Sequence, residues 1–383
     1  LPTSGVYASK NVGTNIQVTA SGLTNSNISA TNGSVIVYGY TLASTNATGL
    51  IGEITPASLT VSSNAGLSKV YGNNDAPGIA TSYSVTSGVL YGSDTITGSM
   101  GRVNGELVGN YAFTQNTVNV SDGNSGGNYN LTFNGTNNPF AITQRPTTGS
   151  ITNQAKAYGT NDPALSGIAV TVGNIVNGNV TDINGTVTNI NDTGNVNTAL
   201  VSLTRNTGEN VGNYTITNAT FDPLSGSAAS NYSGPIFIGT PSLAINTVSL
   251  IVNADPGTKV YGAVDPTLTY SASGLVNTTV TDWMGNTTDI DDQVSGVLTR
   301  APGQNVGPYA ILIGTLTASA NYTTNYTGNT FTITPATLTY LADAASRVYG
   351  SVNPIFTGSV TGFVNGDTQG SSTTGVLTFT SPA

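Results

Sequence analysis

The chain has 383 residues, and charged residues make up only 7% of them, far below the roughly 25% typical of soluble globular domains. Nine Lys and Arg against 18 Asp and Glu give a formal net charge of −9, which argues against a nucleic-acid partner. With no Cys and no His, the sequence excludes disulfides, zinc-thiolate sites, cysteine nucleophiles and the commonest general base. It holds no run of 18 apolar residues, so we expect no membrane-spanning helix. The N-terminus has no basic region followed by an apolar core, so no signal peptide is visible.

The composition favours an all-β protein. Thr, Val, Ile and Tyr prefer strands, Gly and Asn prefer turns, and the good helix formers are scarce. The 47 glycines indicate many tight turns. Helical periodicity is not visible, although a short helix after the segment 365–368 is compatible with a β-grasp layout. Tandem small β-sandwich modules and β-grasp-like modules both remain open.

The predicted units follow one another along the chain without flexible linkers. A partial unit over residues 1–56 ends on Gly-Glu-Ile-Thr-Pro and runs directly into the next opening strand. Full units are predicted over 57–143, 144–246 and 247–335, and a second partial unit over 336–383. We call these the leading segment, the first, second and third repeats, and the trailing segment. We expect the chain to begin and stop inside a unit, and its units to form an elongated rod.

A Tyr-Gly motif marks every unit after the leading segment. A basic residue, an apolar residue, Tyr and Gly stand in succession, and a Pro follows after Asp, Asp-Ala or Asn. The copies are Tyr71, Gly72 and Pro77; Tyr158, Gly159 and Pro163; Tyr261, Gly262 and Pro266; and Tyr349, Gly350 and Pro354. We expect each Tyr to anchor a thin core, each Gly to adopt an unusual φ and each Pro to set a turn.

The basic residue of the motif is Lys69, Lys156, Lys259 and finally Arg347. Its recurrence beside Asn-rich strands raises the possibility of a self-formed Lys–Asn isopeptide crosslink. The alternative is a strand-end charge that discourages sideways sheet pairing. Because arginine cannot form the amide bond, the fourth copy favours the second interpretation.

Two further motifs recur in the three repeats. A Val-Gly-x-Tyr motif lies in 107–111, 210–214 and 305–309, and an Asn-Tyr pair lies at 128–129, 231–232 and 321–322. The signature tyrosines are 87, 103 and 88 residues apart, so the second repeat carries an insertion, which we assign to the polar run 174–197 and expect to be a surface loop. Strands of the third repeat are predicted at 248–252, 259–262, 267–273, 294–300, 309–317 and 330–334.

These motifs together resemble MBG repeats of the Tyr-Gly-X type ("mostly β, glycine-rich"). Residues 6–23 are similar to the tail of the related YDG repeat. The resemblance covers nearly the whole chain, and departs from the family pattern at Asn246-Thr247, where Thr-Pro is expected, and at Arg347. It implies a large bacterial surface or secreted protein, such as the filamentous-haemagglutinin-type adhesins. It also implies no catalytic residues.

From this we predict a structural segment of an extracellular bacterial fibre or adhesin stalk at the cell surface, serving adhesion or a biofilm matrix, and not an enzyme. It would need no cofactor. Its partners would be adjacent repeats or other copies of the chain, with which it could form filaments, and a cell-surface or glycan ligand. One alternative is a module that binds glycans or host surfaces through its loops. Another is a β-rich glycosidase, which would need only two carboxylates.

Three other features have a functional and a plain interpretation. Asp289, Asp291 and Asp292 are weak calcium candidates, against a solvated acidic loop, because calcium needs six to eight converging oxygens. Asn-x-Ser/Thr triplets at Asn213, Asn231 and Asn321 would accept sugars only in a suitable host compartment. The single tryptophan, Trp283, could stack on a sugar, but packing in a core or against a neighbouring unit is favoured.

Overall fold

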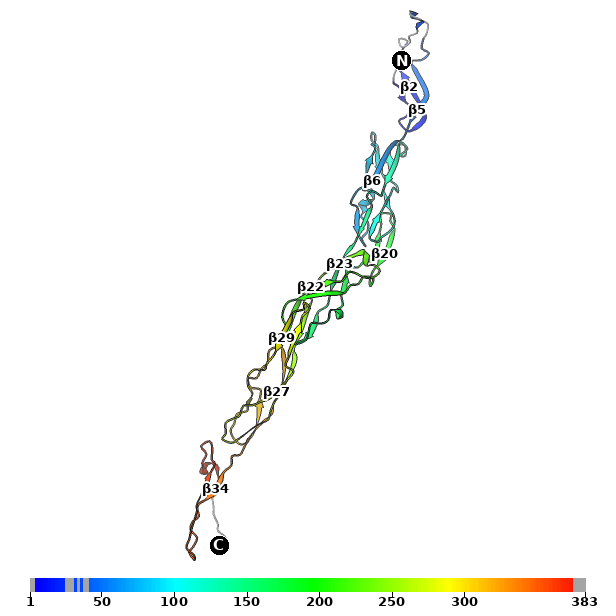
Figure 1. The fold of residues 1–383 in the computed structure, drawn as a ribbon. Helices are drawn as coiled ribbons and strands as arrows, with labels where there is room; N and C mark the ends of the chain where they lie inside the picture. Colours follow the sequence, from blue (N-terminus) through cyan, green and yellow to red (C-terminus); the bar gives the residue numbers. More distant parts are fainter. Residues whose placement is uncertain (1–3, 25–30, 33–34, 37–40, 375–383) are drawn as a thin grey trace. The chain divides into compact units, whose positions relative to one another are not determined.

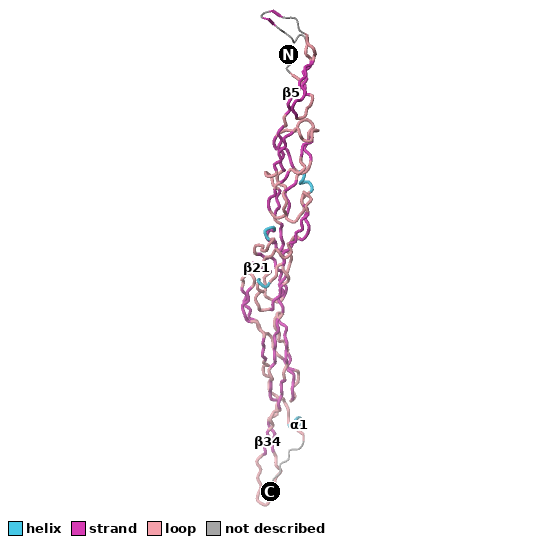
Figure 2. Tube along the Cα trace, turned by 90° about the vertical axis from the view of Figure 1, so that its right-hand side faces the viewer, coloured by secondary structure: helices cyan, strands magenta, loops and turns pink. Residues whose placement is uncertain are grey.

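The computed structural model describes residues 4–24, 31–32, 35–36 and 41–374, which are built almost entirely of strands and turns (Figures 1 and 2). Among these residues, helical structure is confined to η2 (Pro77–Thr81), η3 (Leu165–Gly167), η4 (Ala229–Asn231) and α1 (Gln369–Ser372). The all-β prediction is confirmed. The α1 turn follows the segment 365–368, where a short helix was considered, and none of the described helices has the length and apolar character needed to cross a bilayer.

The chain divides into two compact units, and the division falls inside the second repeat. The first unit comprises Leu1–Ser150, Val170–Ala199 and Phe221–Ile238, and the second comprises Ile151–Ala169, Leu200–Thr220 and Gly239–Ala383. In Figure 1, β6, β20 and β23 mark the first unit, and β27, β29 and β34 mark the second.

The leading segment and the first repeat lie in the first unit. The leading segment contains β1 (Val6–Tyr7), β2 (Gly13–Ser21), β3 (Thr31–Asn32), β4 (Val35–Ile36) and β5 (Asn46–Ile54). The first repeat contains β6 (Ala57–Ser63), β7 (Ser68–Val70), β8 (Tyr83–Ser87), β9 (Thr95–Thr97), β10 (Gly101–Arg102), β11 (Gly109–Tyr111), β12 (Phe113–Thr114), β13 (Asn119–Ser121), β14 (Tyr129–Asn134) and β15 (Phe140–Thr143).

The later repeats keep the opening, Tyr-Gly, Val-Gly, Asn-Tyr and closing strands in the same order but differ in the strands between them. The second contains β16 (Arg145–Ser150), β17 (Gln154–Ala157), β18 (Thr171–Gly173), β19 (Asn177–Thr181), β20 (Val187–Asn191), β21 (Leu200–Arg205), β22 (Gly212–Phe221), β23 (Tyr232–Phe237) and β24 (Ser242–Asn246). The third contains β25 (Val248–Ala254), β26 (Gly257–Val260), β27 (Tyr270–Ser273), β28 (Asn277–Thr281), β29 (Thr287–Asp291), β30 (Thr299–Arg300), β31 (Gly307–Leu312), β32 (Tyr322–Thr327) and β33 (Thr330–Thr334). The trailing segment contains β34 (Thr339–Ala342) and β35 (Gly358–Thr361).

Each repeat builds two small sheets of mixed direction, together with one or two antiparallel sheets of two strands. The opening strand (β6, β16 or β25) pairs in parallel with the Asn-Tyr strand (β14, β23 or β32). The closing strand (β15, β24 or β33) pairs in parallel with the Tyr-Gly strand (β7, β17 or β26) and antiparallel with the Val-Gly strand (β11, β22 or β31). In the first repeat Val61 of one sheet and Phe140 and Ile142 of the other share one buried core. With two sheets facing one core and no described α-helix within the repeats, the arrangement is sandwich-like.

Successive repeats are joined with almost no linker. One residue, Gln144, separates β15 from β16, and one residue, Thr247, separates β24 from β25. Two residues, Thr55 and Pro56, separate β5 from β6. The prediction of direct strand-to-strand connections is therefore confirmed between β5 and β6, whereas four residues, 335–338, separate β33 from β34. The short connections leave the repeats that they join little freedom to move apart.

The polar run 174–197 is not the surface loop that we predicted. It forms the hairpin β19–β20, in which Val180 and Ile190 turn inward and are 1% and 8% exposed. The third repeat has the same hairpin as β28–β29, so the element is not peculiar to the second repeat. Single apolar residues set among Asn and Thr alternate at the strand period, and this weak signal is easily mistaken for loop composition.

Candidate functional site at the repeat joints

The signature tyrosine of the first repeat is buried in the second repeat. Tyr71 is 2% exposed, and its hydroxyl donates to Asp192 Oδ2 at 2.9 Å. The Tyr232 hydroxyl donates to the same oxygen at 2.7 Å, and the two rings meet edge to face with centroids 5.4 Å apart. Asp192 closes the base of the β19–β20 hairpin through an N–H bond to the Val176 carbonyl. One carboxylate of the second repeat thus holds a tyrosine from each repeat.

The joint between the second and third repeats has the same construction. Tyr158 is 4% exposed and donates to Asp292 Oδ2 at 2.8 Å. Tyr322 donates to that oxygen at 2.6 Å, with ring centroids 5.7 Å apart. Burial, reinforced by the hydrogen bond to Asp292, raises the pKa of Tyr322 to about 12 and that of Tyr158 well above its usual range. Both hydroxyls therefore stay protonated and remain donors at neutral pH.

The glycine after each buried tyrosine fits against a valine of the next repeat. Gly72 and Gly159 have φ of +77° and +79°, as we expected for this position. A Cβ on Gly72 would lie 2.3 Å from Val176 Cγ2, and one on Gly159 would lie 2.5 Å from Val276 Cγ1. Glycine is needed at both positions for its backbone conformation and for this close approach.

We therefore expect Gly159→Ala to destabilise the protein by more than the about 1–2 kcal/mol that a left-handed conformation alone costs an L-residue. Gly350 is a matched control, because its φ is +83° and its Cβ position has no neighbour within 4 Å. Gly350→Ala should therefore show the smaller, purely conformational cost. Urea unfolding of both variants measures the difference, and equal losses would show that contact with Val276 is immaterial.

Beside each tyrosine lies a network of four charged groups. In the first repeat, Lys69 Nζ lies 2.7 Å from Asp75 Oδ1 and also contacts Glu106. The Arg102 guanidinium contacts the same two carboxylates, with its Nε 2.6 Å from Asp75 Oδ2. The next repeat closes the network, since the Ile183 N–H donates to Asp75 Oδ2 at 3.0 Å. Two cations and two anions thus balance in a buried site, as buried ions require.

The second repeat repeats this network with Lys156, Asp162, Arg205 and Glu209. There the Trp283 N–H donates to Asp162 Oδ2 at 3.1 Å, and its indole N–H donates to the Pro163 carbonyl at 2.6 Å. Trp283 therefore contacts the neighbouring repeat. Packing in a core or against a neighbouring unit was the interpretation that the sequence favoured over stacking on a sugar.

The third repeat has a partial network of Lys259, Asp265 and Arg300, with Gln304 in place of the glutamate. The Asp265 side chain is 41% exposed, whereas those of Asp75 and Asp162 are 0% and 1% exposed. A cleft of about 520 Å³ lies beside Asp265. At the corresponding place in the first two networks, a hairpin of the following repeat covers the aspartate. Burial of the network therefore depends on the next repeat.

The prediction that the motif lysines are strand-end charges is wrong, because all three are buried in these networks. Their ammonium groups contact carboxylates, and at Lys259 also the Gln304 amide oxygen, rather than asparagine side chains. Burial alone would raise the pKa of Asp75 and Asp162, but hydrogen bonds from the arginine and lysine outweigh it and hold both below the ordinary value. The carboxylates stay ionised, and an ionised carboxylate is a poor electrophile for amide crosslinking.

This electrostatic arrangement predicts a loss of stability in acid. Hydrogen bonds from Arg300 and Lys259 lower the pKa of Asp265 to about 2, and Asp75 and Asp162 are lowered as well. A depressed folded-state pKa stabilises the protein above the unfolded value of about 3.9, and this stabilisation is lost as the pH falls through the folded value. We expect the melting temperature to be level between about pH 5 and pH 8 and to fall between about pH 4 and pH 2. A melting curve unchanged down to pH 2 would contradict these pairings.

The asparagine of the Asn-Tyr pair fastens each repeat to the preceding one. The side-chain oxygens of Asn128, Asn231 and Asn321 accept the backbone N–H of Val12, Val108 and Val211, at 2.9, 3.0 and 2.8 Å. Asn231 and Asn321, which we considered as glycosylation acceptors, are only 4% and 7% exposed and are committed to this contact. Asn213, the third candidate, is exposed on β22.

The remaining candidate residues lie apart from these contacts. Asp289 accepts from Thr279 Oγ1 and Asp291 from Asn277 and Gln293, while Asp292 holds the two tyrosines, so the three calcium candidates do not converge. No group of three or more potential metal ligands occurs among the residues that the structure describes. Pro77 begins η2, and Pro163, Pro266 and Pro354 follow the turn after their tyrosines without lying in a strand.

The signature tyrosines outside the two complete joints are less buried. Tyr261 is half-buried, and Gly262 lies against Val364 of the trailing segment, where a Cβ would be 2.4 Å from Val364 Cγ2. Tyr349 is fully exposed, contrary to its expected role as a core anchor. At the two complete joints the tyrosine is held by the repeat that follows it, and not by its own repeat.

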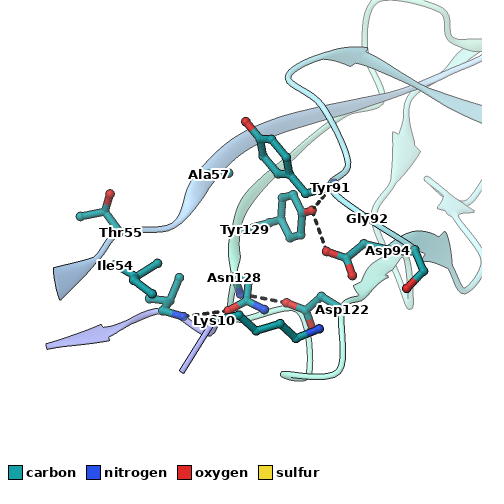
Figure 3. Close-up of a pocket in the computed structure, with 12 residues that line it drawn as sticks. Lys10, Ile54, Thr55, Ala57, Tyr91, Gly92, Asp94, Asp122, Asn128 and Tyr129 are labelled. Atoms are coloured by element: carbon teal, nitrogen blue, oxygen red, sulfur yellow. Dashed lines mark hydrogen bonds between the residues drawn. The ribbon is translucent and has the colours of Figure 1, made fainter. Parts of the chain in front are cut away.

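The first repeat has the receiving half of the same joint. Its Tyr129 donates to Asp94 Oδ2 at 2.8 Å and accepts the Tyr91 N–H at 2.8 Å, as Tyr232 does with Asp192 and Val176. Here the two carboxylates Asp94 and Asp122, the stacked ring of Tyr91 and Lys10 border a pocket of about 400 Å³ (Figure 3). Asp94 and Asp192 were not among the predicted residues, and Asp292 was predicted only as a weak calcium candidate, although an aspartate recurs upstream of each Asn-Tyr pair.

Residues 250–332 and 338–382 match the model of the MBG domain of the YGX type. The match supports MBG repeats in this part of the chain. The prediction made from the Tyr-Gly motif is thereby confirmed for the third repeat and the trailing segment, and MBG content indicates a repeat-containing surface protein. The second repeat shares the strand order and the tyrosine joint of residues 250–332, whereas the described residues of the first repeat hold no hairpin like β28–β29. No curated protein matches the chain. The YDG-like character of residues 6–23 stays a prediction.

Proposed function

We propose that the chain is a load-bearing segment of an extracellular bacterial fibre or adhesin stalk, and that it acts by holding length and stiffness rather than by catalysis. The observation that carries this proposal is the shared joint, in which one repeat's tyrosine is buried and hydrogen-bonded inside the next. Force applied along the chain would have to break this contact before two repeats could separate.

Buried clusters that neighbouring repeats share support the same conclusion. Val61 and Phe140 of the first repeat belong to one buried cluster with Val180 and Tyr232 of the second. Tyr158 and Ile245 of the second repeat likewise share a cluster with residues of the third. A repeat whose core is completed by its neighbour is stabilised by the contact with that neighbour, as in a solenoid protein.

Small-angle X-ray scattering of the purified chain tests the proposal. A compact protein of this length would have a radius of gyration of about 21 Å, whereas a stalk should give about twice that value or more. A value near the compact limit would reject the stalk. Immunogold electron microscopy of the producing cells then tests location, with label on surface fibres expected and label confined to the cytoplasm contradicting it.

A further inference from the structure

Each repeat begins and ends with strands that pair with each other in parallel. In the third repeat, the entry run consists of β25 and β26, over residues 248–260, and the exit run consists of β32 and β33, over residues 322–334. Strand β25 pairs with β32 in one sheet and β26 pairs with β33 in the other, and the paired residues are 74 positions apart in both sheets. The two runs therefore keep one register along their whole length.

The first and second repeats contain the same two runs. In the first repeat, β6 and β7 pair in parallel with β14 and β15, and in the second, β16 and β17 pair in parallel with β23 and β24. The second repeat is the longest, yet its runs 145–157 and 232–246 pair in this way, so most of its additional residues fall between them. The pairing of the first strands with the last is thus a feature that all three repeats keep.

Side chains also fasten the two runs, and an asparagine does so where the runs cross from one sheet to the other. The Asn329 side-chain N–H donates to the Ala254 carbonyl at 3.0 Å, and Asn138 donates to the Ser63 carbonyl at 2.9 Å in the first repeat. Three more side-chain bonds join the runs of the third repeat: Thr258 to the Thr332 carbonyl, Asn325 to Ser249 Oγ, and Thr334 to the Lys259 carbonyl. The runs are thus linked even where the backbone pairing is interrupted.

The order of these strands decides how tension along the chain acts on a repeat. The chain enters the third repeat at the start of β25 and leaves it at the end of β33, and these two points lie at opposite ends of the paired runs. Tension would therefore slide one run past the other. Because the hydrogen bonds of a parallel ladder are evenly spaced along it, sliding loads many of them together, whereas a pull across the strands breaks them one after another. Residues 261–321, between the runs, bear no tension while the pairing holds.

We propose that the paired runs make each repeat a tension clamp, which holds until its hydrogen bonds fail together and then opens in a single step. This proposal rests on the proposed stalk function and adds a second function, the absorption of excess tension. An extended residue spans at most about 3.6 Å, so the opening of one repeat of this size lengthens the chain by about 250–300 Å. Excess load is then taken up as added length of the stalk.

Single-molecule force spectroscopy of the full chain tests the proposal, with handles on introduced cysteines, because the chain has none of its own. The pair S249C and T332C lies at opposite ends of the runs, so pulling slides them. The pair S249C and T323C lies side by side at one end, so pulling peels them apart. All three positions are exposed, and their thiols are kept reduced until the handles are attached. Because forced unfolding is governed by the barrier to opening, we expect a rupture force at least about twofold higher for sliding than for peeling.

A matched pair of asparagine variants tests which residues bear the tension. N329A removes the bond between the runs at the crossing, so we expect it to lower the sliding force. N277A is the control, because Asn277 is exposed on β28, between the runs, and bonds to Asp291 of the same hairpin. This control should leave the sliding force unchanged. Equal losses from the two variants would show that residues between the runs bear tension and would overturn the clamp.

Two other results would also overturn the proposal: equal rupture forces in the two pulling directions, or gradual lengthening without a step when the runs slide. If a cysteine variant does not fold, as judged by Trp283 fluorescence, the cysteine-free chain pulled by its two ends decides. It should lengthen in steps of about 250–300 Å, and a gradual extension would contradict the clamp. Failure of these tests with an extended scattering profile would reject the tension clamp and leave the stalk function standing.

Discussion

Replacing Tyr158 by alanine is expected to cost about 3–5 kcal/mol of stability, the range for removing a buried aromatic side chain. The change removes a ring that is 4% exposed, its edge-to-face contact with Tyr322 and its hydrogen bond to Asp292. Urea unfolding followed by Trp283 fluorescence measures the loss, because this single tryptophan lies in the same joint.

Tyr349→Ala is the matched control for this prediction. The residue has the same place in the motif, but its side chain is fully exposed. We expect its replacement to change the stability of the separate chain by no more than about 0.5 kcal/mol. Equal losses at Tyr158 and Tyr349 would mean that the motif acts within its own repeat and not through the joint.

The second large effect is expected from Asp162→Asn. Lys156 and Arg205 would keep only Glu209 as a carboxylate partner, which leaves one positive charge buried without compensation. Breaking a buried ion pair in this way typically costs about 3–5 kcal/mol. Thermal or urea unfolding by circular dichroism measures the loss and avoids a probe that touches Asp162 directly.

The same substitution at Asp265 distinguishes the effect of burial on stability from the effect of charge alone. Asp265 contacts a lysine and an arginine as Asp162 does, but its side chain is 41% exposed. Water and salt can compensate there, so we expect Asp265→Asn to cost no more than about 1 kcal/mol. If both substitutions cost the same stability, then burial by the next repeat would not determine how much these charged networks contribute to stability.

The repeated motifs allowed the fold class and the connections between repeats to be predicted. Alternation in 330–334 predicted β33 with the bounds observed, and the Ile-Thr-Pro ending before Ala57 predicted the direct joint between β5 and β6. The unusual φ of the glycine after each tyrosine also followed from the motif. These are local properties, set by side-chain period and backbone conformation, and a single sequence contains them.

The strands and contacts that depend on the neighbouring repeat were not predictable in the same way. Strands β28 and β29 of the third repeat were missed, because Val280 and Ile290 are isolated among polar residues and gain their burial from packing. The pairing of Tyr158 with Asp292 spans 134 residues, and no local pattern specifies it. A usable signal did exist: an arginine recurs six residues before the valine of each Val-Gly motif, at Arg102, Arg205 and Arg300.

A double-mutant cycle between Tyr158 of the second repeat and Asp292 of the third tests most directly whether successive repeats share one joint. Stability is measured by urea unfolding for the parent, Tyr158→Phe, Asp292→Ala and the double variant. Since hydrogen bonds to charged groups contribute about 1.5–3 kcal/mol, we expect a coupling energy of at least about 1 kcal/mol. Effects that add to within about 0.5 kcal/mol would show that the two residues act independently and that the repeats are not joined through them.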